Sequence, residues 1–260
     1  MHASKPAFSR WFVLLVAGIA VPAGFAAEPE TGRSVYASQC AVCHGANGAP
    51  DADSPVVKGL GVTPANFSDP LFNSREPAAD WEMVIEYGGH ALGLAEQMPP
   101  QGETLSAEEI AEVTAYLKSI VDTSAYPPGE MNLFLPTRTK KAFPEDEVVY
   151  KGRYTNQEGD NSFKNVLEIE KRIGKRGQAI LEFVHESEGS VSELAEVEVG
   201  YKQALSYSDR HILSGAAVWA IPVEADGDGE LQTYLAYGRV LSPSWIFQSS
   251  LRFKFPLSLI

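Results

Sequence analysis

Both cysteines of the chain stand in one short segment, "QCAVCHGAN", in which Cys40 and Cys43 are followed directly by His44. Thiols at this spacing can form a redox disulfide, supply half of a zinc site, or attach a haem. A thiol–disulfide site of the thioredoxin kind needs a strand before the cysteines, whereas residues 28–39 have the pattern of a short helix. Zinc needs two further ligands, and the other histidines are scattered singly. The unit C-x-x-C-H is the signature of a covalently attached c-type haem, which we expect here.

The spacing also predicts how such a haem would be held. Two thiols three residues apart can reach the two vinyl groups of one porphyrin, and the imidazole of His44 then points at the iron. An electron-transfer haem takes a second axial ligand. We expect this ligand to be Met98, in "AEQMPPQGETLS", because prolines exclude helix and stiffen the loop. The alternatives are His90, which follows a Gly-Gly pair, Met83, whose position predicts helix packing, and Met131, which lies beyond the last helix of this half.

Two amphipathic stretches flank the Met98 loop. Residues 77–89, "PAADWEMVIEYGG", predict a helix that stops at the Gly-Gly pair. Residues 105–121 predict a second helix, since Ser106 and Glu109 form an S-x-x-E capping box. Its apolar stripe at helical spacing consists of Ile110, Val113, Leu117 and Val121.

The order of these features resembles a class I cytochrome c over residues 30–122. The shared features are a helix ending in C-x-x-C-H, an intervening helix, a Met-Pro loop and a closing helix with a Tyr-Leu pair. The resemblance implies an all-α cytochrome c fold in which the first and last helices cross. Gly32 or Tyr36 would then meet Tyr116.

The resemblance also implies roles for single residues. The carbonyl of Pro55, with that of Pro50 as the alternative, would orient His44 through its second ring nitrogen, as metal-bound histidines are usually oriented. His44 and Met98 would be the two iron ligands of one haem c, bound through Cys40 and Cys43. The chain would then be an electron carrier and not an enzyme. A peroxidase-like activity is the least favoured alternative, because Met98 would close the iron position that peroxide needs.

The first 26 residues have the pattern of a secretory signal peptide. Lys5 and Arg10 flank the start of an apolar run at residues 11–21, and small residues follow up to position 26. This run is short for a membrane span, so we expect a cleaved signal, with an uncleaved anchor as the alternative. The mature chain is expected in the periplasm or outer membrane of a Gram-negative bacterium.

Charge and composition divide the rest of the chain. Residues 28–125 carry 15 acidic and 4 basic side chains, a net charge of −11, whereas residues 126–260 carry 19 and 15, a net charge of −4. We predict a cytochrome c domain at 27–123, a Pro-rich linker at 124–146 and an all-β domain at 147–260. The acidic first half argues against nucleic acid as a partner and favours redox proteins with a basic surface.

The last part of the chain alternates between apolar and polar residues. Stretches such as "LAEVEVGYK" and "WIFQSSLRFKF" predict six or seven antiparallel strands between residues 147 and 257, without helical interruption. A soluble β-sandwich would bury one face of each sheet, whereas a membrane β-barrel would turn its apolar face to lipid. Membrane barrels need about eight strands or more, so a barrel here would be incomplete or would be closed by several copies. The basic turn "KRIGKRG" is expected to be solvated, with contact to anionic head groups as the alternative.

This half resembles outer-membrane β-barrel proteins that carry an N-terminal cytochrome c module. The resemblance rests on "YPPGE", "AFPEDE" and the "YLAYG" strand. It implies a membrane-barrel-like domain, with a β-sandwich as the alternative, and an electron carrier tethered to the outer membrane. The alternative function is an outer-membrane pore or transport component with an accessory cytochrome.

Overall fold

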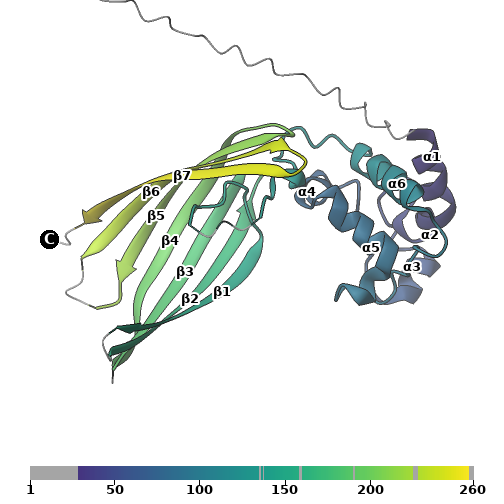
Figure 1. The fold of residues 1–260 in the computed structure, drawn as a ribbon. Coiled ribbons are helices and arrows are strands. Elements are labelled where there is room, and N and C mark those ends of the chain that lie inside the picture. Colours follow the sequence, from purple (N-terminus) through teal and green to yellow (C-terminus); the bar gives the residue numbers. More distant parts are fainter. Residues whose placement is uncertain are drawn as a thin grey trace, which may run out of the picture.

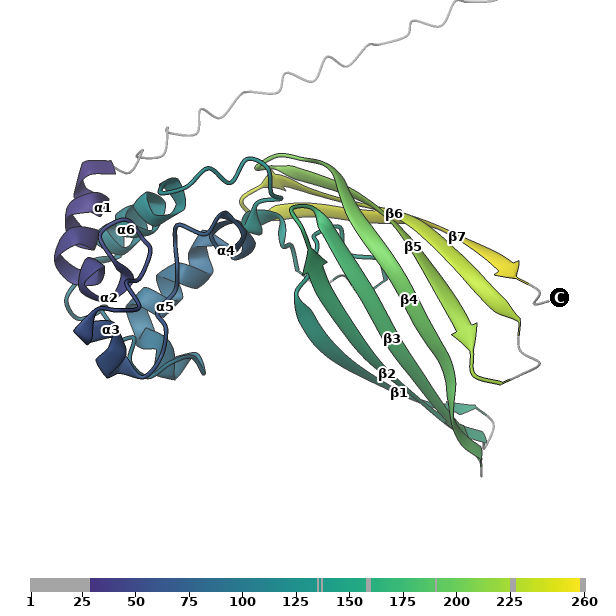
Figure 2. The same ribbon diagram turned by 180° about the vertical axis from the view of Figure 1, so that it is seen from behind.

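The computed structural model describes residues 29–134, 136, 138–157, 160–189, 191–224 and 228–257. A helical region is followed by a curved β-sheet (Figure 1), and the same two regions are seen from behind in Figure 2. The predicted signal peptide lies outside the described residues. Within the described ranges, no helix has both the length and the apolarity that a bilayer crossing requires.

The helical region begins with three consecutive segments around the two cysteines. Its elements are α1 (Pro29–Val35), the π-helical turn η1 (Tyr36–Cys40), α2 (Ala41–His44), α3 (Pro55–Leu60), α4 (Pro70–Arg75), α5 (Ala78–Ala91) and α6 (Ala107–Ser119). The first and last helices cross where Gly32 leaves room, since a Cβ there would lie 2.1 Å from the carbonyl oxygen of Glu112. The rings of Tyr36 and Tyr116 lie 5.5 Å apart at the same crossing. The expected contact between the two helices is therefore present.

Helix α6 starts with the predicted capping box. The Ser106 hydroxyl accepts from the backbone N–H of Glu109 at 3.2 Å, and the Glu109 carboxylate accepts from the backbone N–H of Ser106 at 2.9 Å. These two bonds satisfy amides that a helix start leaves without partners. The apolar stripe of α6 faces a core made of Val35, Tyr36, Trp81, Ile85, Leu105, Ile110, Val113 and Leu117.

The β-strands form one seven-stranded antiparallel meander. They are β1 (Glu147–Gln157), β2 (Asp160–Ile173), β3 (Gly177–Glu188), β4 (Val191–Tyr207), β5 (His211–Pro222), β6 (Gly229–Ser242) and β7 (Trp245–Leu257). The order in the sheet follows the chain from β1 to β7, so the described strands form a half-barrel with β1 and β7 at its edges. The expectation of an antiparallel β region is confirmed. The β-sandwich alternative is wrong for the described strands, because it would need two facing sheets.

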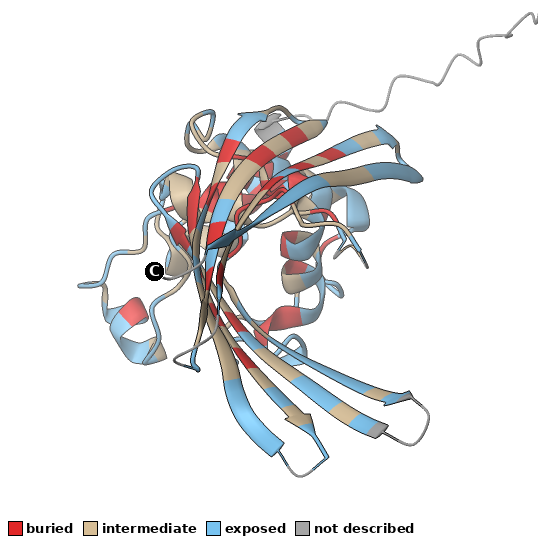
Figure 3. Cartoon of the chain, turned by 90° about the vertical axis from the view of Figure 1, so that its left-hand side faces the viewer, coloured by how far each residue is buried: buried red, intermediate tan, exposed pale blue. Residues whose placement is uncertain are grey.

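The two faces of the sheet differ in chemistry. On β3, buried Gln178, Ile180, Glu182 and Val184 alternate with partly exposed residues, as the period of two requires. We call the face that carries these four residues the inner face and the opposite face the outer face. Figure 3 shows the curvature of the sheet together with the burial of its residues. The outer face exposes large apolar side chains, among them Tyr150, Leu167, Val199, Trp219, Leu235, Phe247, Leu251, Phe253 and Phe255.

The linker between the two regions packs against the inner face. After the 3₁₀ turn η2 (Gly129–Met131), the chain buries Met131 and Phe143, each only 1% exposed, in a core with residues of the sheet. Ser214 on β5 donates to the carbonyl of Ala142 at 2.5 Å, and Lys202 on β4 donates to the carbonyl of Lys141 at 3.4 Å. The sequence predicted only a connector at 124–146, whereas part of this segment is an integral piece of the β region.

Candidate haem site

The two cysteines lie at the end of the first helical segment. Cys40 is the last residue of η1, and Cys43 and His44 belong to α2. Both thiols are unbonded and half-buried. Burial, and secondarily the neighbouring Cys43, raise the pKa of Cys40 to about 11. A π-helical turn shifts the rotation of the residues that follow it, and such turns are frequent at functional sites.

The His44 ring is held through one nitrogen. Its Nδ1 atom lies 3.0 Å from the carbonyl oxygen of Ala65, and its ring centroid lies 4.8 Å from that of Phe67. Burial lowers the pKa of His44, and the hydrogen bond to Ala65 partly opposes this shift. Because Nδ1 is directed at a carbonyl, Nε2 is the ring nitrogen that can reach an iron atom.

The predicted role of Pro55 is wrong in this structure. Pro55 is the first residue of α3, a position that suits proline because no helical partner is needed for its missing N–H. The Ser54 side chain caps this helix by accepting from the backbone N–H of Val56. The carbonyl on His44 belongs to Ala65, which directly follows Pro64. A backbone carbonyl has no side-chain signature, so no residue type in the sequence identifies the acceptor.

The chain turns sharply after His44, and Tyr36 fixes that turn. The Tyr36 hydroxyl donates to the carbonyl of Gly45 at 2.6 Å. Gly45 has a φ of +77°, and a Cβ there would lie 1.9 Å from the carbonyl oxygen of Ala49. Only glycine combines this backbone conformation with so close an approach. Tyr36 is thus both a core residue and a support for the histidine segment, which sequence periodicity did not reveal.

Met98 is positioned by a loop that packs on the end of α5. The backbone N–H of Gly89 donates to the carbonyl of Met98 at 2.9 Å. A Cβ on Gly88, whose φ is +78°, would lie 2.8 Å from the nitrogen of Pro100. A Cβ on Gly89 would lie 2.1 Å from the carbonyl oxygen of Ala95. The Gly-Gly pair therefore allows the Met98 loop to approach the helix closely, in addition to ending the regular part of α5.

Met98 and Cys40 share one apolar environment. Both pack, partly buried, against the core that includes Tyr36, Ile85 and Val113. The structure thus places a thioether and a thiol of the C-x-x-C-H segment against the same cluster. The assignment of Met98 as an iron ligand stays a prediction.

The alternative ligands lie in other surroundings. We expected Met83 on α5 to pack in the core, but its side chain is 46% exposed and does not belong to it. His90 is exposed, and its Nδ1 atom lies 3.5 Å from a carboxylate oxygen of Glu96. Met131 is buried in the core of the β region. None of these three side chains belongs to the apolar cluster that Met98 contacts.

The donor set fits a haem of the c type. It offers two thiols at the attachment spacing, an imidazole with one nitrogen already oriented, and a thioether on the same apolar core. Among the described residues, no group of three or more His, Cys, Asp or Glu side chains is placed to hold a metal ion. The zinc alternative therefore gains no support from the described part of the chain.

The comparison with protein families bears on the helical part of the chain. Residues 27–117 match the family described as Cytochrome C oxidase, cbb3-type, subunit III. No curated protein and no solved structure matched the chain. The family match ends before the linker and does not reach the β-strands. This match supports a c-type cytochrome domain at residues 27–117 and haem-based electron transfer, while the half-barrel sheet lies outside the matched family.

Proposed function

We propose that the chain is an electron carrier with a single haem c, held covalently by Cys40 and Cys43 and ligated by His44 and Met98. The observation that carries this proposal is the orientation of the His44 ring. His44 directly follows Cys43 in the chain, and its Nδ1 atom lies 3.0 Å from the carbonyl oxygen of Ala65. A histidine held in this way presents Nε2 in a fixed direction, as an axial ligand must. When bound, the haem supplies one-electron exchange between Fe(II) and Fe(III).

The protein residues have separable tasks at this site. Cys40 at the end of η1 and Cys43 in α2 would hold the porphyrin, and Tyr36 together with the Ala65 carbonyl holds His44 in place. The aromatic side chains of Phe67, Phe72 and Trp81 pack on one another within 6.1 Å between centroids and line the core beside His44. An apolar surrounding of this kind excludes water and raises the reduction potential, and a thioether ligand acts in the same direction.

A methionine ligand also favours electron transfer over catalysis. Peroxide chemistry needs an open iron position, and Met98 would occupy it. The Met98 loop packs closely on Gly88 and Gly89, and this close packing would keep the methionine side chain in a fixed position. We therefore infer that the chain is not a peroxidase.

We further propose that the β region seats the protein in an outer membrane, with the haem domain in the periplasm after export by the N-terminal signal. The outer face supports this seat because its exposed side chains have the distribution of a lipid-facing surface. Leu167, Val199, Leu235 and Leu251 lie near the middle of their strands on this face. Several of its aromatic residues lie toward strand ends, among them Tyr201, Tyr237, Trp245 and Phe247 toward the linker and Tyr154, Phe163, Trp219 and Phe255 toward the opposite end.

The inner face supports an anchor more than a pore. The linker covers it near the helical region, and its backbone is bonded to side chains on several strands. Gln178 on β3 accepts from the N–H of Glu145 at 2.6 Å, and Arg252 on β7 donates to the carbonyl of Arg138 at 3.0 Å. A segment held at both sides of the sheet would obstruct passage along the inner face.

The charge of the helical region suggests the kind of partner. Residues 28–125 have a net charge of −11. An acidic surface accelerates encounters with basic proteins at low ionic strength, and salt weakens this effect. We propose that the electron partners are redox proteins with a basic surface, and nucleic acid is not among the partners.

One experiment tests the two parts of this proposal together. Cells that express the full chain are fractionated, and haem staining is combined with a redox titration of each fraction. We expect a haem-stained band in the outer-membrane fraction, a reversible one-electron transition and a low-spin spectrum. Haem staining only in the soluble periplasm would overturn the membrane seat, and a high-spin spectrum open to peroxide would overturn the electron-carrier assignment.

A further inference from the structure

One end of the sheet carries a group of exposed cations that the electron-transfer site does not use. This linker end is formed by three hairpin turns, residues 174–176, 208–210 and 243–244. Lys175 and Arg176 lie in the first turn and Arg210 in the second, all of them exposed. Arg239 extends from the outer face of β6 beside the second turn and is also exposed.

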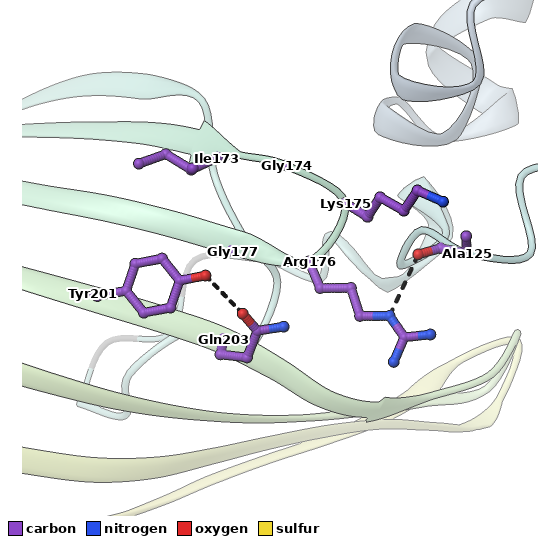
Figure 4. A pocket seen from close by; sticks show the side chains of 8 residues that line it. All are labelled: Ala125, Ile173, Gly174, Lys175, Arg176, Gly177, Tyr201 and Gln203. Atoms are coloured by element: carbon purple, nitrogen blue, oxygen red, sulfur yellow. Dashed lines mark hydrogen bonds between the residues drawn. The ribbon is translucent and has the colours of Figure 1, made fainter.

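The first hollow lies beside the turn at 174–176 and has a volume of about 590 Å³. Figure 4 shows its lining residues, with Lys175 and Arg176 at the turn and Tyr201 on the neighbouring strand. The Arg176 Nε atom donates to the carbonyl of Ala125 at 3.4 Å, which ties the turn to the linker. No carboxylate belongs to the described residues that line this hollow.

The wall of the first hollow is apolar and belongs to the outer face. Tyr201 packs across Gly177, where a Cβ would lie 2.1 Å from the tyrosine hydroxyl oxygen. The hydroxyl itself donates to Gln203 at 2.7 Å. Ile173, which is 52% exposed, lines the same hollow. The hollow thus has cations at its rim and apolar carbon along its wall.

The second hollow repeats this composition at the turn 208–210. It has a volume of about 530 Å³, and Arg210 and Arg239 line it together with Leu213 and Tyr237 of the outer face. Its one carboxylate is Asp209. His211 is held there by serine hydroxyls, with Ser208 2.8 Å from Nδ1 and Ser206 3.2 Å from Nε2.

The opposite end of the sheet has the other sign of charge. Exposed acidic residues dominate the described strand ends and turns there: Glu186, Glu188, Glu193, Glu224 and Asp228. The sheet is therefore polarised along its strands, with its cations beside the acidic helical region. If the outer face contacts lipid, the cations meet the head groups of the leaflet on the side of the helical region.

We propose that the two hollows bind the phosphate head groups of anionic glycerophospholipids, whose acyl chains then lie along the outer face. The inference rests on the membrane seat proposed above. Two cations at each hollow complement a phosphodiester, and the Tyr and aliphatic side chains below them complement hydrocarbon. These contacts also offset the repulsion between an anionic bilayer and a helical region with a net charge of −11.

The test uses the full haem-loaded chain in a nonionic detergent. The protein is equilibrated with equal amounts of phosphatidylglycerol and phosphatidylcholine of matched acyl chains, and the retained lipids are counted by native mass spectrometry. We expect preferential retention of phosphatidylglycerol. The double variants K175Q/R176Q and R210Q/R239Q should each reduce the preference, and the combined variant should reduce it at least about tenfold.

The control removes the same number of charges elsewhere. K164Q/K254Q neutralises two lysines that pair with Glu186 and Glu230 on the sheet, and it should leave the lipid preference unchanged. An equal loss in this control, or no preference in the unaltered chain, would overturn the head-group assignment. Displacement of phosphatidylglycerol by inorganic phosphate at equal concentration would also overturn it, because lipid binding requires the apolar wall.

A second measurement separates this inference from the membrane seat. The chain is reconstituted with vesicles of phosphatidylcholine alone and with added phosphatidylglycerol, and flotation is measured after an alkaline carbonate wash. Flotation with both vesicles but no lipid preference would overturn only the head-group sites. Failure to float with either vesicle would overturn the membrane seat and, with it, the head-group inference.

Discussion

The backbone N–H of Gly89 donates to the carbonyl oxygen of Met98 at 2.9 Å, so the end of α5 directly supports the loop that carries the predicted thioether ligand. This contact depends on a helix end without side chains, because a Cβ on Gly89 would lie 2.1 Å from the carbonyl oxygen of Ala95. The position of Met98 is therefore coupled to the Gly-Gly pair that precedes it.

Replacing Met98 by alanine removes the predicted sulfur ligand. We expect Met98→Ala to abolish the sulfur-to-iron charge-transfer band of the oxidised protein and to lower its reduction potential. Visible spectroscopy and a redox titration measure both effects. The matched control is Met83→Ala, since Met83 is 46% exposed on α5. A charge-transfer band that survives in Met98→Ala, or disappears in Met83→Ala, would contradict the assignment of the ligand.

The crossing of α1 and α6 is expected to be intolerant of a side chain at Gly32. In Gly32→Ala the new Cβ would lie 2.1 Å from the carbonyl oxygen of Glu112, so the helices must separate and the core around Tyr36 must loosen. We expect a loss of about 1–3 kcal/mol in the free energy of unfolding, measured by denaturant titration of the full chain.

Gly59 provides the control for that substitution. It lies in α3, and a Cβ there would meet no atom within 4 Å. Gly59→Ala should leave the stability unchanged or increase it by about 0.4–1 kcal/mol, because alanine restricts the unfolded chain. Equal effects of the two substitutions would show that the helix crossing is not the tight contact that the structure describes.

The linker should contribute to the stability of the β region through Phe143. This side chain is 1% exposed and belongs to the core formed with the sheet. We expect Phe143→Ala to lower the free energy of unfolding by about 3–5 kcal/mol. The comparison is Phe134→Ala, because Phe134 in the same linker is 83% exposed. If the two variants unfold at the same denaturant concentration, the linker is only a tether.

The membrane seat predicts a difference between the two faces of one strand. Leu235 lies in the middle of β6 on the outer face and is 44% exposed, whereas Gln232 lies on the inner face of the same strand. Leu235→Arg should destabilise the membrane-inserted protein by about 2–4 kcal/mol, since an arginine would enter hydrocarbon.

Gln232→Arg should have a much smaller effect, because its side chain stays on the polar inner face. Unfolding in lipid vesicles, followed by tryptophan fluorescence, measures both variants. If Leu235→Arg is as stable in lipid as the unaltered chain, the outer face does not contact the bilayer.

Local sequence patterns were enough to predict the chemistry of the haem segment and the types of the main elements. Cys40, Cys43 and His44 are adjacent in the chain, so their joint role follows from local spacing. The Ser106–Glu109 capping box and the strand alternation are equally local, and the structure has both. Local patterns are predictable because the atoms that interact are separated by only a few residues.

Contacts between groups that are distant in the chain could be read only from the folded protein. The carbonyl on His44 belongs to Ala65 and not to Pro55, because a loop fold selects one of many chemically identical carbonyls. Likewise, Phe143 became a core residue because the sheet curves around a segment whose prolines predicted only a connector. At the linker end, Tyr201 of β4 meets the turn that carries Lys175 and Arg176, and Arg239 of β6 lies beside the turn that carries Arg210, because strand register brings them together. Contacts of this kind depend on chain topology, which composition and periodicity do not specify.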